Sequence, residues 1–159
     1  MGCIFSKNAK NAIIPNKTLK PKQFVFLGGA CGTTSWRMDQ AIPELEKRGI
    51  NYFNPQVPNN QWSPELMQAE FDAREKATCL LFVFDPSTRG IVTFVEIAYH
   101  MAKNNKCILI VNLPGEFKTN NPDELKDIMR GKSYIIDLAK RNNIKIYTSL
   151  SEAIETIQN

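Results

Sequence analysis

The chain alternates short apolar runs with longer stretches in which apolar residues recur at helical spacing. Each short run predicts a strand, and each longer stretch predicts a helix. The strands are expected at residues 24–27, 50–54, 79–85, 106–111 and 144–147, and the helices at 35–48, 63–76, 91–100, 121–141 and 149–158. This alternation predicts a single α/β domain in which a five-stranded parallel sheet is wound with helices on both faces.

Residues at the ends of the predicted helices support these boundaries. Ser63 followed by Pro64 is typical of a helix start, because Ser caps free N–H groups and Pro fits the first helical position. Gly49 is expected to end the first helix in a left-handed conformation. Pro43 lies inside that helix and is expected to kink it.

The stretch from the third strand into its helix carries two acids. In a doubly wound sheet of the flavodoxin- or Rossmann-like kind, we expect the strand order 2-1-3-4-5, with ligands bound at the carboxyl ends of the first and third strands. Asp85 ends the third strand, and Glu96 lies early in the next helix, so both are expected to face that crevice. Paired carboxylates there suit glycoside chemistry, one as nucleophile and one handling protons.

A glycine-rich turn at residues 28–35 follows the first strand and is expected at the same crevice. A strand–turn–helix unit of this kind often holds phosphate or ribose on backbone N–H groups. The glycine spacing matches neither the dinucleotide-binding pattern nor the P-loop pattern. A tight turn without a ligand explains these residues equally well.

Composition restricts the chemistry and the partners. The 159 residues include four cysteines, none in a Cys-x-x-Cys pair, and a single histidine, so we expect no metal site and no cofactor. Cysteines inside apolar runs indicate reduced thiols and an intracellular protein. Residues 1–38 carry six basic and no acidic side chains, which leaves the rest of the chain at a net charge of −2 and argues against a nucleic-acid partner.

Residues 1–22 differ from the rest of the chain in composition. Residues 1–22 are rich in Lys and Asn, so we expect a flexible basic arm before a domain at residues 23–159. Gly2 and the Ser at the sixth position fit N-myristoylation, and Cys3 is a candidate for palmitoylation. The opening resembles the acylated N-termini of Src-family kinases and G-protein α subunits. It predicts a place at the cytoplasmic face of a membrane; an unmodified leader would leave the protein in the cytoplasm.

Several short segments together resemble the nucleoside 2-deoxyribosyltransferase superfamily, in particular a deoxyribosyltransferase-like subgroup. They cover most of residues 23–147 and comprise Gly28-Gly29, Ser35-Trp36-Arg37, Asn54-Pro55, Trp62 and Glu96-Ile97-Ala98-Tyr99. The last is similar to the family segment Glu-x-Gly-Tyr-Ala, whose Glu is the nucleophile. The resemblance implies cleavage of an N-glycosidic bond, or (deoxy)ribosyl transfer, on a nucleoside or nucleotide.

The resemblance also implies roles for individual residues. Glu96 would attack the anomeric carbon and form a glycosyl-enzyme intermediate. Asp72 matches a family Asp near the reacting sugar and Asp85 matches the strand-end acid, so either would position the sugar or protonate the leaving base. The residues implied to contact the substrate are Gly28, Gly29, Trp36, Arg37, Asn54 and Tyr99.

Departures from the family leave a second function open. Ala98 replaces a glycine of the Glu segment, Val92 stands where the family has glycine, and Trp36-Arg37 stands where a standard transferase has different residues. The departures at Val92 and Trp36-Arg37 also fit a membrane-tethered nucleotide-binding module without turnover. Glu96 would then be a helix residue paired with a nearby basic side chain, and Asp85 an ordinary turn former. Relatives complete their sites across subunits, so a homo-oligomer stays open as well.

Overall fold

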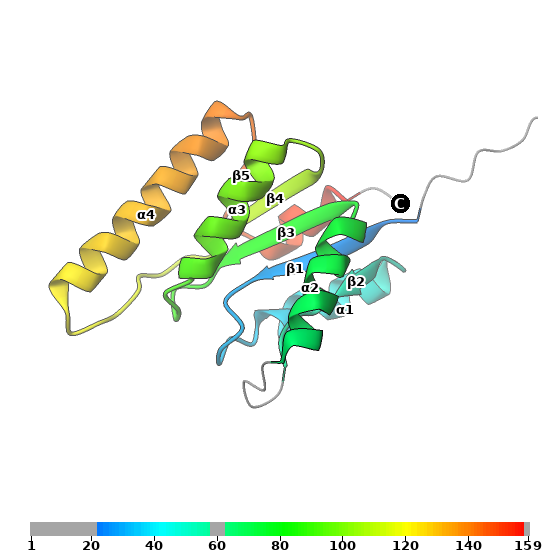
Figure 1. Cartoon of the computed structure of the whole chain (residues 1–159), viewed down its shortest axis with the longest axis horizontal. Helices are drawn as coiled ribbons and strands as arrows, with labels where there is room; N and C mark the ends of the chain where they lie inside the picture. Colours follow the sequence, from blue (N-terminus) through cyan, green and yellow to red (C-terminus); the bar gives the residue numbers. More distant parts are fainter. Residues whose placement is uncertain (1–21, 58–62, 158–159) are drawn as a thin grey trace, which may run out of the picture.

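A five-stranded parallel sheet lies at the centre of the structure, a computed structural model that describes residues 22–57 and 63–157 (Figure 1). The strands are β1 (Phe24–Gly29), β2 (Asn51–Phe53), β3 (Cys79–Phe84), β4 (Cys107–Asn112) and β5 (Ile146–Tyr147). Their order is β2-β1-β3-β4-β5, which confirms the expected arrangement. Gly29 at the end of β1 pairs with Val83 near the end of β3, so the loops after these two strands start side by side.

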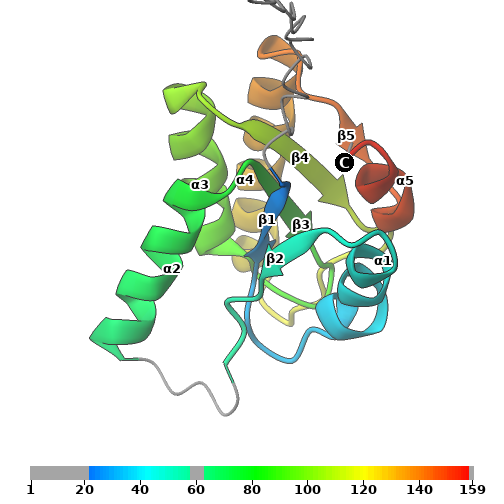
Figure 2. The same cartoon turned by 90° about the vertical axis from the view of Figure 1, so that its right-hand side faces the viewer.

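Helices cover both faces of the sheet (Figure 2). On one face lie the π-helix η1 (Arg37–Ala41), α1 (Ile42–Lys47) and α5 (Leu150–Glu155), and on the other lie α2 (Pro64–Lys76), α3 (Ile91–Lys103) and α4 (Pro122–Arg141). This is the doubly wound α/β architecture that the alternation of strands and helices predicts.

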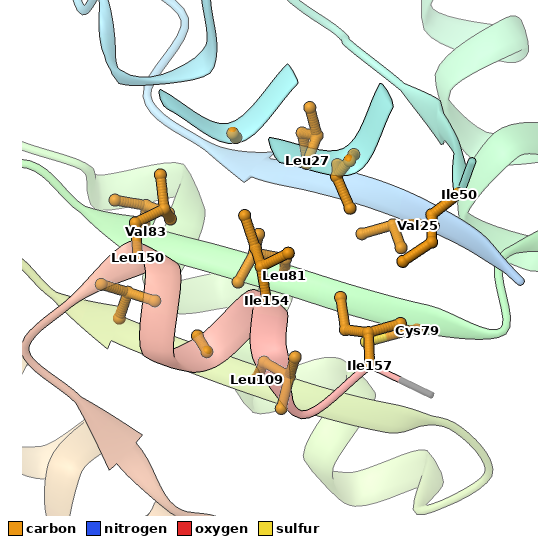
Figure 3. Packing of buried hydrophobic residues seen from close by; sticks show 14 of the residues in the cluster. Val25, Leu27, Ile50, Cys79, Leu81, Val83, Leu109, Leu150, Ile154 and Ile157 are labelled. Atoms are coloured by element: carbon orange, nitrogen blue, oxygen red, sulfur yellow. The ribbon is translucent and has the colours of Figure 1, made fainter. Parts of the chain in front are cut away.

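Each strand contributes to two separate cores, because successive residues of a strand point to opposite faces of the sheet. Val25 and Leu27 of β1 face α1 and α5, where Ile154 packs over the sheet (Figure 3). Phe26 of β1 and Phe82 of β3 belong to the other core, beneath α2, α3 and α4. β3 is buried along its whole length, in agreement with an uninterrupted apolar run covered on both faces.

Most helix ends follow the signals in the sequence. The Ser63 side chain accepts a hydrogen bond from the N–H of Leu66 at 3.2 Å, and Gly49 has a φ of 67°. Ser149 caps α5. That helix ends earlier than expected, and β5 is shorter than the predicted strand at 144–147.

The first helix differs from the single kinked helix expected at 35–48. It starts with the π-helix η1, and regular α-helix begins only at Ile42, with Pro43 in its first turn. Pro43 has no N–H and cannot make the α-helical bond to the carbonyl four residues earlier. The N–H of Ile42 instead reaches the carbonyl of Arg37, five residues back, which is the π-helical bond.

Candidate functional site

Glu96 lies in a cavity of about 380 Å³ between α2 and α3. Gly90, with a φ of 60°, starts α3 directly after the turn that follows β3. Ile97 is fully buried against the sheet, and this fixes the rotation of α3 so that its neighbour Glu96 faces α2. The cavity is lined by Met67, Glu70, Phe71, Arg74, Glu75, Val92, Val95, Glu96, Tyr99 and His100.

Arg74 holds two carboxylates of this cavity together. Its Nη1 donates a hydrogen bond to Oε1 of Glu96, and its Nη2 lies 3.7 Å from Oε1 of Glu70. Arg74 is 8% exposed, and its guanidinium also lies over the rings of Phe71, at 4.6 Å, and Phe26, at 5.5 Å. The packing leaves Arg74 little freedom, so the row Glu70–Arg74–Glu96 is a rigid feature of the α2–α3 interface.

Burial dominates the electrostatics of the row. It raises the pKa of Glu96 to about 7, although Arg74 opposes the shift, and the negative charge of Glu70 adds to it. Burial also raises the pKa of Glu70. Burial, with Arg74 next, lowers the pKa of His100 to about 4, so this imidazole is neutral at physiological pH. The Glu96 carboxyl therefore exchanges its proton near neutral pH, which is where a catalytic carboxyl is most useful.

Arg37 fixes the glycine-rich turn from underneath. The side chain is 0% exposed, and its Nε and Nη2 donate to the carbonyls of Leu27 and Gly29, at 3.2 and 2.8 Å. Its Nη1 donates to the carbonyl of Ala30 at 2.9 Å. Gln56 holds the same turn from the other side, through Nε2 bonds to turn carbonyls. The side chains of Arg37 and Gln56 thus hold the turn in place through its backbone carbonyls.

The glycines and Trp36 of this region have packing partners in the structure. A Cβ on Gly28 would overlap the buried ring of Phe82, and one on Gly29, whose φ is 141°, would lie 2.9 Å from the carbonyl oxygen of Val83. Trp36 is 2% exposed in the core beneath α1 and α5. None of the four predicted residues Gly28, Gly29, Trp36 and Arg37 lines the Glu96 cavity.

The turn nevertheless lies at the same edge of the sheet as Glu96. The loops after β1 and β3 start side by side because Gly29 pairs with Val83, but no residue of the turn lines the Glu96 cavity. A crevice shared by the turn and Glu96, and substrate contact by the turn, stay predictions.

A second cavity of about 230 Å³ adjoins the first through Glu70, which lines both. Asn54 lies in this second cavity, and its Oδ1 accepts a hydrogen bond from the N–H of Gln56 at 3.0 Å. The structure thus brings three sequence-predicted residues to two adjoining cavities, Glu96 and Tyr99 to the first and Asn54 to the second.

Asp72 and Asp85 lie outside both cavities. Asp72 is exposed, and its Oδ1 accepts a hydrogen bond from Gln68 at 2.9 Å. Oδ1 of Asp85 accepts from the N–H and the hydroxyl of Ser87, at 2.8 and 2.6 Å, which closes an Asx turn after β3. The proposed catalytic roles of these two acids stay predictions.

Glu70 and Arg74 are the residues that the sequence analysis missed. A signal for them exists, because their spacing of four places them on one face of α2, whereas Asp72 is rotated by about 200° from Glu70 around the helix axis. Nothing in the sequence alone shows that this face of α2 meets Glu96.

Some predicted features fall outside the description or have no counterpart in it. Gly2, Cys3 and Trp62 lie outside the described residues. Within residues 22–57 and 63–157, no helix is long and apolar enough to cross a membrane. The same residues hold no group of three or more His, Cys, Asp or Glu side chains placed to bind a metal ion.

Comparison with known proteins shows which family the chain matches. Residues 22–113, more than half of the chain, match the family described as "Nucleoside 2-deoxyribosyltransferase like". No curated protein matches the chain in sequence. The match spans β1 to β4 and includes both cavities and the row Glu70–Arg74–Glu96.

Solved structures with the same fold are distant in sequence. A conserved protein from Enterococcus faecalis is 13% identical over 85% of this chain and 98% of its own, with a TM-score of 0.59. The TIR domains of the activated Roq1 resistosome are 15% identical over 85% of this chain and 92% of theirs, with a TM-score of 0.51. The CMP N-glycosidase BcmB of Clostridium botulinum is 20% identical over 75% of this chain and 99% of its own, but its TM-score of 0.41 supports no inference here.

Proposed function

Because the chain belongs to the nucleoside 2-deoxyribosyltransferase-like family, we propose that it cleaves or transfers the N-glycosidic bond of a nucleoside or nucleotide, with Glu96 as nucleophile. The observation that carries the proposal is the Glu96 carboxyl itself. It is largely buried, opens into a cavity of about 380 Å³ and has a pKa of about 7. A carboxylate that lacks full hydration attacks an anomeric carbon more readily than an exposed one.

The proposed reaction proceeds in two steps. An Oε of Glu96 bonds to the anomeric carbon while the bond to the base breaks, and the leaving nitrogen takes the electron pair and a proton. Water or a second base then attacks the same carbon and releases Glu96. Arg74 orients the Glu96 carboxylate through their hydrogen bond. Tyr99, on the cavity wall, and Asn54, in the second cavity, are proposed to contact the substrate.

The remaining predicted residues enter the proposal in weaker roles. We propose that Trp36 and Arg37 act through the turn that they support, and that Gly28 and Gly29 shape the edge of the sheet beside the substrate. Asp85 would act by fixing the turn before α3.

Base release tests the proposal directly. The full chain is incubated with a panel of ribo- and deoxyribonucleosides and their 5′-monophosphates, and free base is quantified by chromatography. Wild type should release base, Glu96→Gln should bind the same substrate without releasing base, and acid-quenched wild type should carry one sugar on the peptide that contains Glu96. Glu75→Gln is the matched control, because Glu75 lines the same cavity but pairs with Lys103 at 2.9 Å, and it should keep activity.

Two outcomes would contradict this function. Full turnover by Glu96→Gln would show that Glu96 is not the nucleophile. Binding of a nucleotide without base release by wild type would instead support the second candidate, a binding module without turnover. Val92 favours that candidate, because its side chain is 70% exposed on the wall of the Glu96 cavity at a position where the family has glycine.

Attachment to a membrane through Gly2 and Cys3 is a separate proposal that rests on the sequence pattern of the first residues. In eukaryotic cells the mature protein should carry myristate on Gly2 and sediment with membranes, and Gly2→Ala should abolish both. Intact-mass analysis that finds an unmodified N-terminus would contradict it.

A further inference from the structure

Glu70 occupies the boundary between the two cavities of the site. It lines the Glu96 cavity and also the cavity that holds Asn54. Its side chain is 13% exposed, about as little as that of Glu96 at 12%. The other acid of the first cavity, Glu75, has a 55% exposed side chain and pairs with Lys103. Among the described residues, Glu70 is therefore the buried carboxyl that accompanies the proposed nucleophile.

Resting on the function proposed above, we propose that Glu70 is the second catalytic carboxyl, which protonates the leaving base and then deprotonates the water or base that replaces it. Arg74 holds the two carboxyls near each other, because its Nη1 donates a hydrogen bond to Glu96 and its Nη2 lies 3.7 Å from Oε1 of Glu70. Two carboxyls that lie close together and flank the bond between the sugar and the leaving group are the arrangement that glycosyl transfer through a covalent intermediate requires.

The position of Glu70 also indicates which cavity holds the sugar and which holds the base. With the sugar in the larger cavity over Glu96 and the base toward Asn54, the bond between sugar and base crosses the boundary where Glu70 stands. The side-chain amide of Asn54 offers both a donor and an acceptor to the edge of a base. This orientation places the proton donor at the nitrogen that leaves.

The proton and the electrons balance in each step. When Oε of Glu96 bonds to the anomeric carbon, the electron pair of the carbon–nitrogen bond goes to the base, and the Glu70 proton goes to the same nitrogen. In the second step the water or acceptor base loses its proton to Glu70 as its oxygen or nitrogen bonds to the anomeric carbon. The ester bond breaks as this new bond forms, and its electron pair returns to Glu96.

One guanidinium between two buried carboxyls favours a single shared proton, because two ionised groups would leave a net negative charge in the cavity. The direct hydrogen bond from Arg74 favours the charge on Glu96, whereas deep burial of Glu96 favours the proton there. The reaction proceeds from the form that carries the charge on Glu96 and the proton on Glu70. The pH dependence of the rate then belongs to the pair rather than to either carboxyl alone.

The test compares Glu70→Gln with Glu65→Gln, which makes the same chemical change at an exposed acid in the first turn of α2 that lines neither cavity. Each variant is assayed with a nucleoside and with the matching 4-nitrophenyl glycoside, whose leaving group needs no proton. Glu70→Gln should lose about 10²–10⁴-fold in kcat/KM on the nucleoside, since this is the usual contribution of a general acid. It should lose less than about tenfold on the nitrophenyl glycoside, and Glu65→Gln should match wild type on both.

A second variant covers the case in which Glu70→Gln folds poorly. Glu70→Ala removes the acid without adding an amide, and it should show the same dependence on the leaving group, with a large loss on the nucleoside and a loss of less than about tenfold on the nitrophenyl glycoside. Equal losses on both substrates, or no loss, in a Glu70→Gln protein with wild-type melting temperature would overturn the role of Glu70 while leaving Glu96 as nucleophile. Wild type that releases no base would overturn the proposed function, and this role with it.

Discussion

Replacement of Glu96 by Gln tests which of two opposing effects controls the buried carboxyl. Burial favours the neutral form, and the hydrogen bond from Arg74 favours the charged form. In the structure burial is the stronger, and the pKa of Glu96 rises from an ordinary value of 4.5 to about 7. Gln keeps the size and shape of the side chain but cannot ionise, so it removes this titration from the folded protein.

The sign and size of the effect follow from the linkage between proton binding and folding. Between pH 4.5 and 7 the folded protein holds a proton on Glu96 that the unfolded chain has released. Stability from this group is therefore fully present below about pH 4.5 and is lost as the pH rises through 7. At about 1.4 kcal/mol for each pH unit, the loss amounts to roughly 3 kcal/mol. The free energy of unfolding of Glu96→Gln, minus that of wild type, should therefore rise by roughly 3 kcal/mol as the pH increases from 4.5 to 7.

Urea unfolding of both proteins at four pH values between 4.5 and 7.5 measures the difference, and subtraction cancels the carboxyls that the variants share. Glu75→Gln is the matched control, because the hydrogen bond from Lys103 lowers the pKa of Glu75, so this group titrates below the pH range of the experiment and the Glu75→Gln difference should stay flat. A Glu96→Gln difference that stays flat, or that falls as the pH rises, would show that the Arg74 ion pair outweighs burial and would refute this account of the site.

Three further predictions concern neighbouring features. Arg74→Met should lower the free energy of unfolding by about 3–5 kcal/mol at pH 8, because it leaves a buried carboxylate unpaired, and should move the pH midpoint of kcat/KM above that of wild type, as Glu96 loses its cation. Cys107 should react with iodoacetamide with a midpoint below that of an ordinary thiol, because the thiol of Cys79 donates to it and lowers its pKa, and Cys79→Ala should raise that midpoint in peptide mass analysis. Gly28→Ala should cost about 1–3 kcal/mol in urea unfolding, since the added methyl overlaps a buried ring of β3.

The sheet could be predicted from the sequence because its strands are marked by continuous apolar runs. β3 is the clearest case, with a run of six residues that are all buried, and turn residues at once after it. When five strands alternate with helices, the right-handed connection between parallel strands allows only a few strand orders in the sheet. β5 was overestimated because residues 144–147 have apolar alternation, but only Ile146 and Tyr147 pair with β4.

The site was predicted only in part, because its chemistry depends on the contacts of side chains between helices. Glu96 was found through its family segment, and the structure gives it a cavity. Arg37 was expected to meet a substrate, but its donors bond to backbone carbonyls of its own turn, a use of arginine that leaves no mark in the sequence. Asp72 drew attention by family position, whereas Glu70, two residues earlier, has the helical phase that faces Glu96.

The charge of the two cavities leads to a prediction about the substrate. Among the described lining residues, Arg74 is the one side chain that is cationic at neutral pH, and it already faces both Glu70 and Glu96. Above the pKa of Glu96, which is about 7, the pair has lost its shared proton and Arg74 compensates only one of the two carboxylates. A 5′-phosphate within about 8 Å of the other is repelled by roughly 2 kcal/mol at an effective dielectric constant of about 20, or about thirtyfold in affinity. At pH 7.5 wild type should therefore show a kcat/KM for the nucleoside well above that for its 5′-monophosphate. Added salt should narrow the gap by screening the repulsion. Preference for the monophosphate, weakened by salt, would contradict this electrostatic argument and point to a cation contributed from outside the described residues.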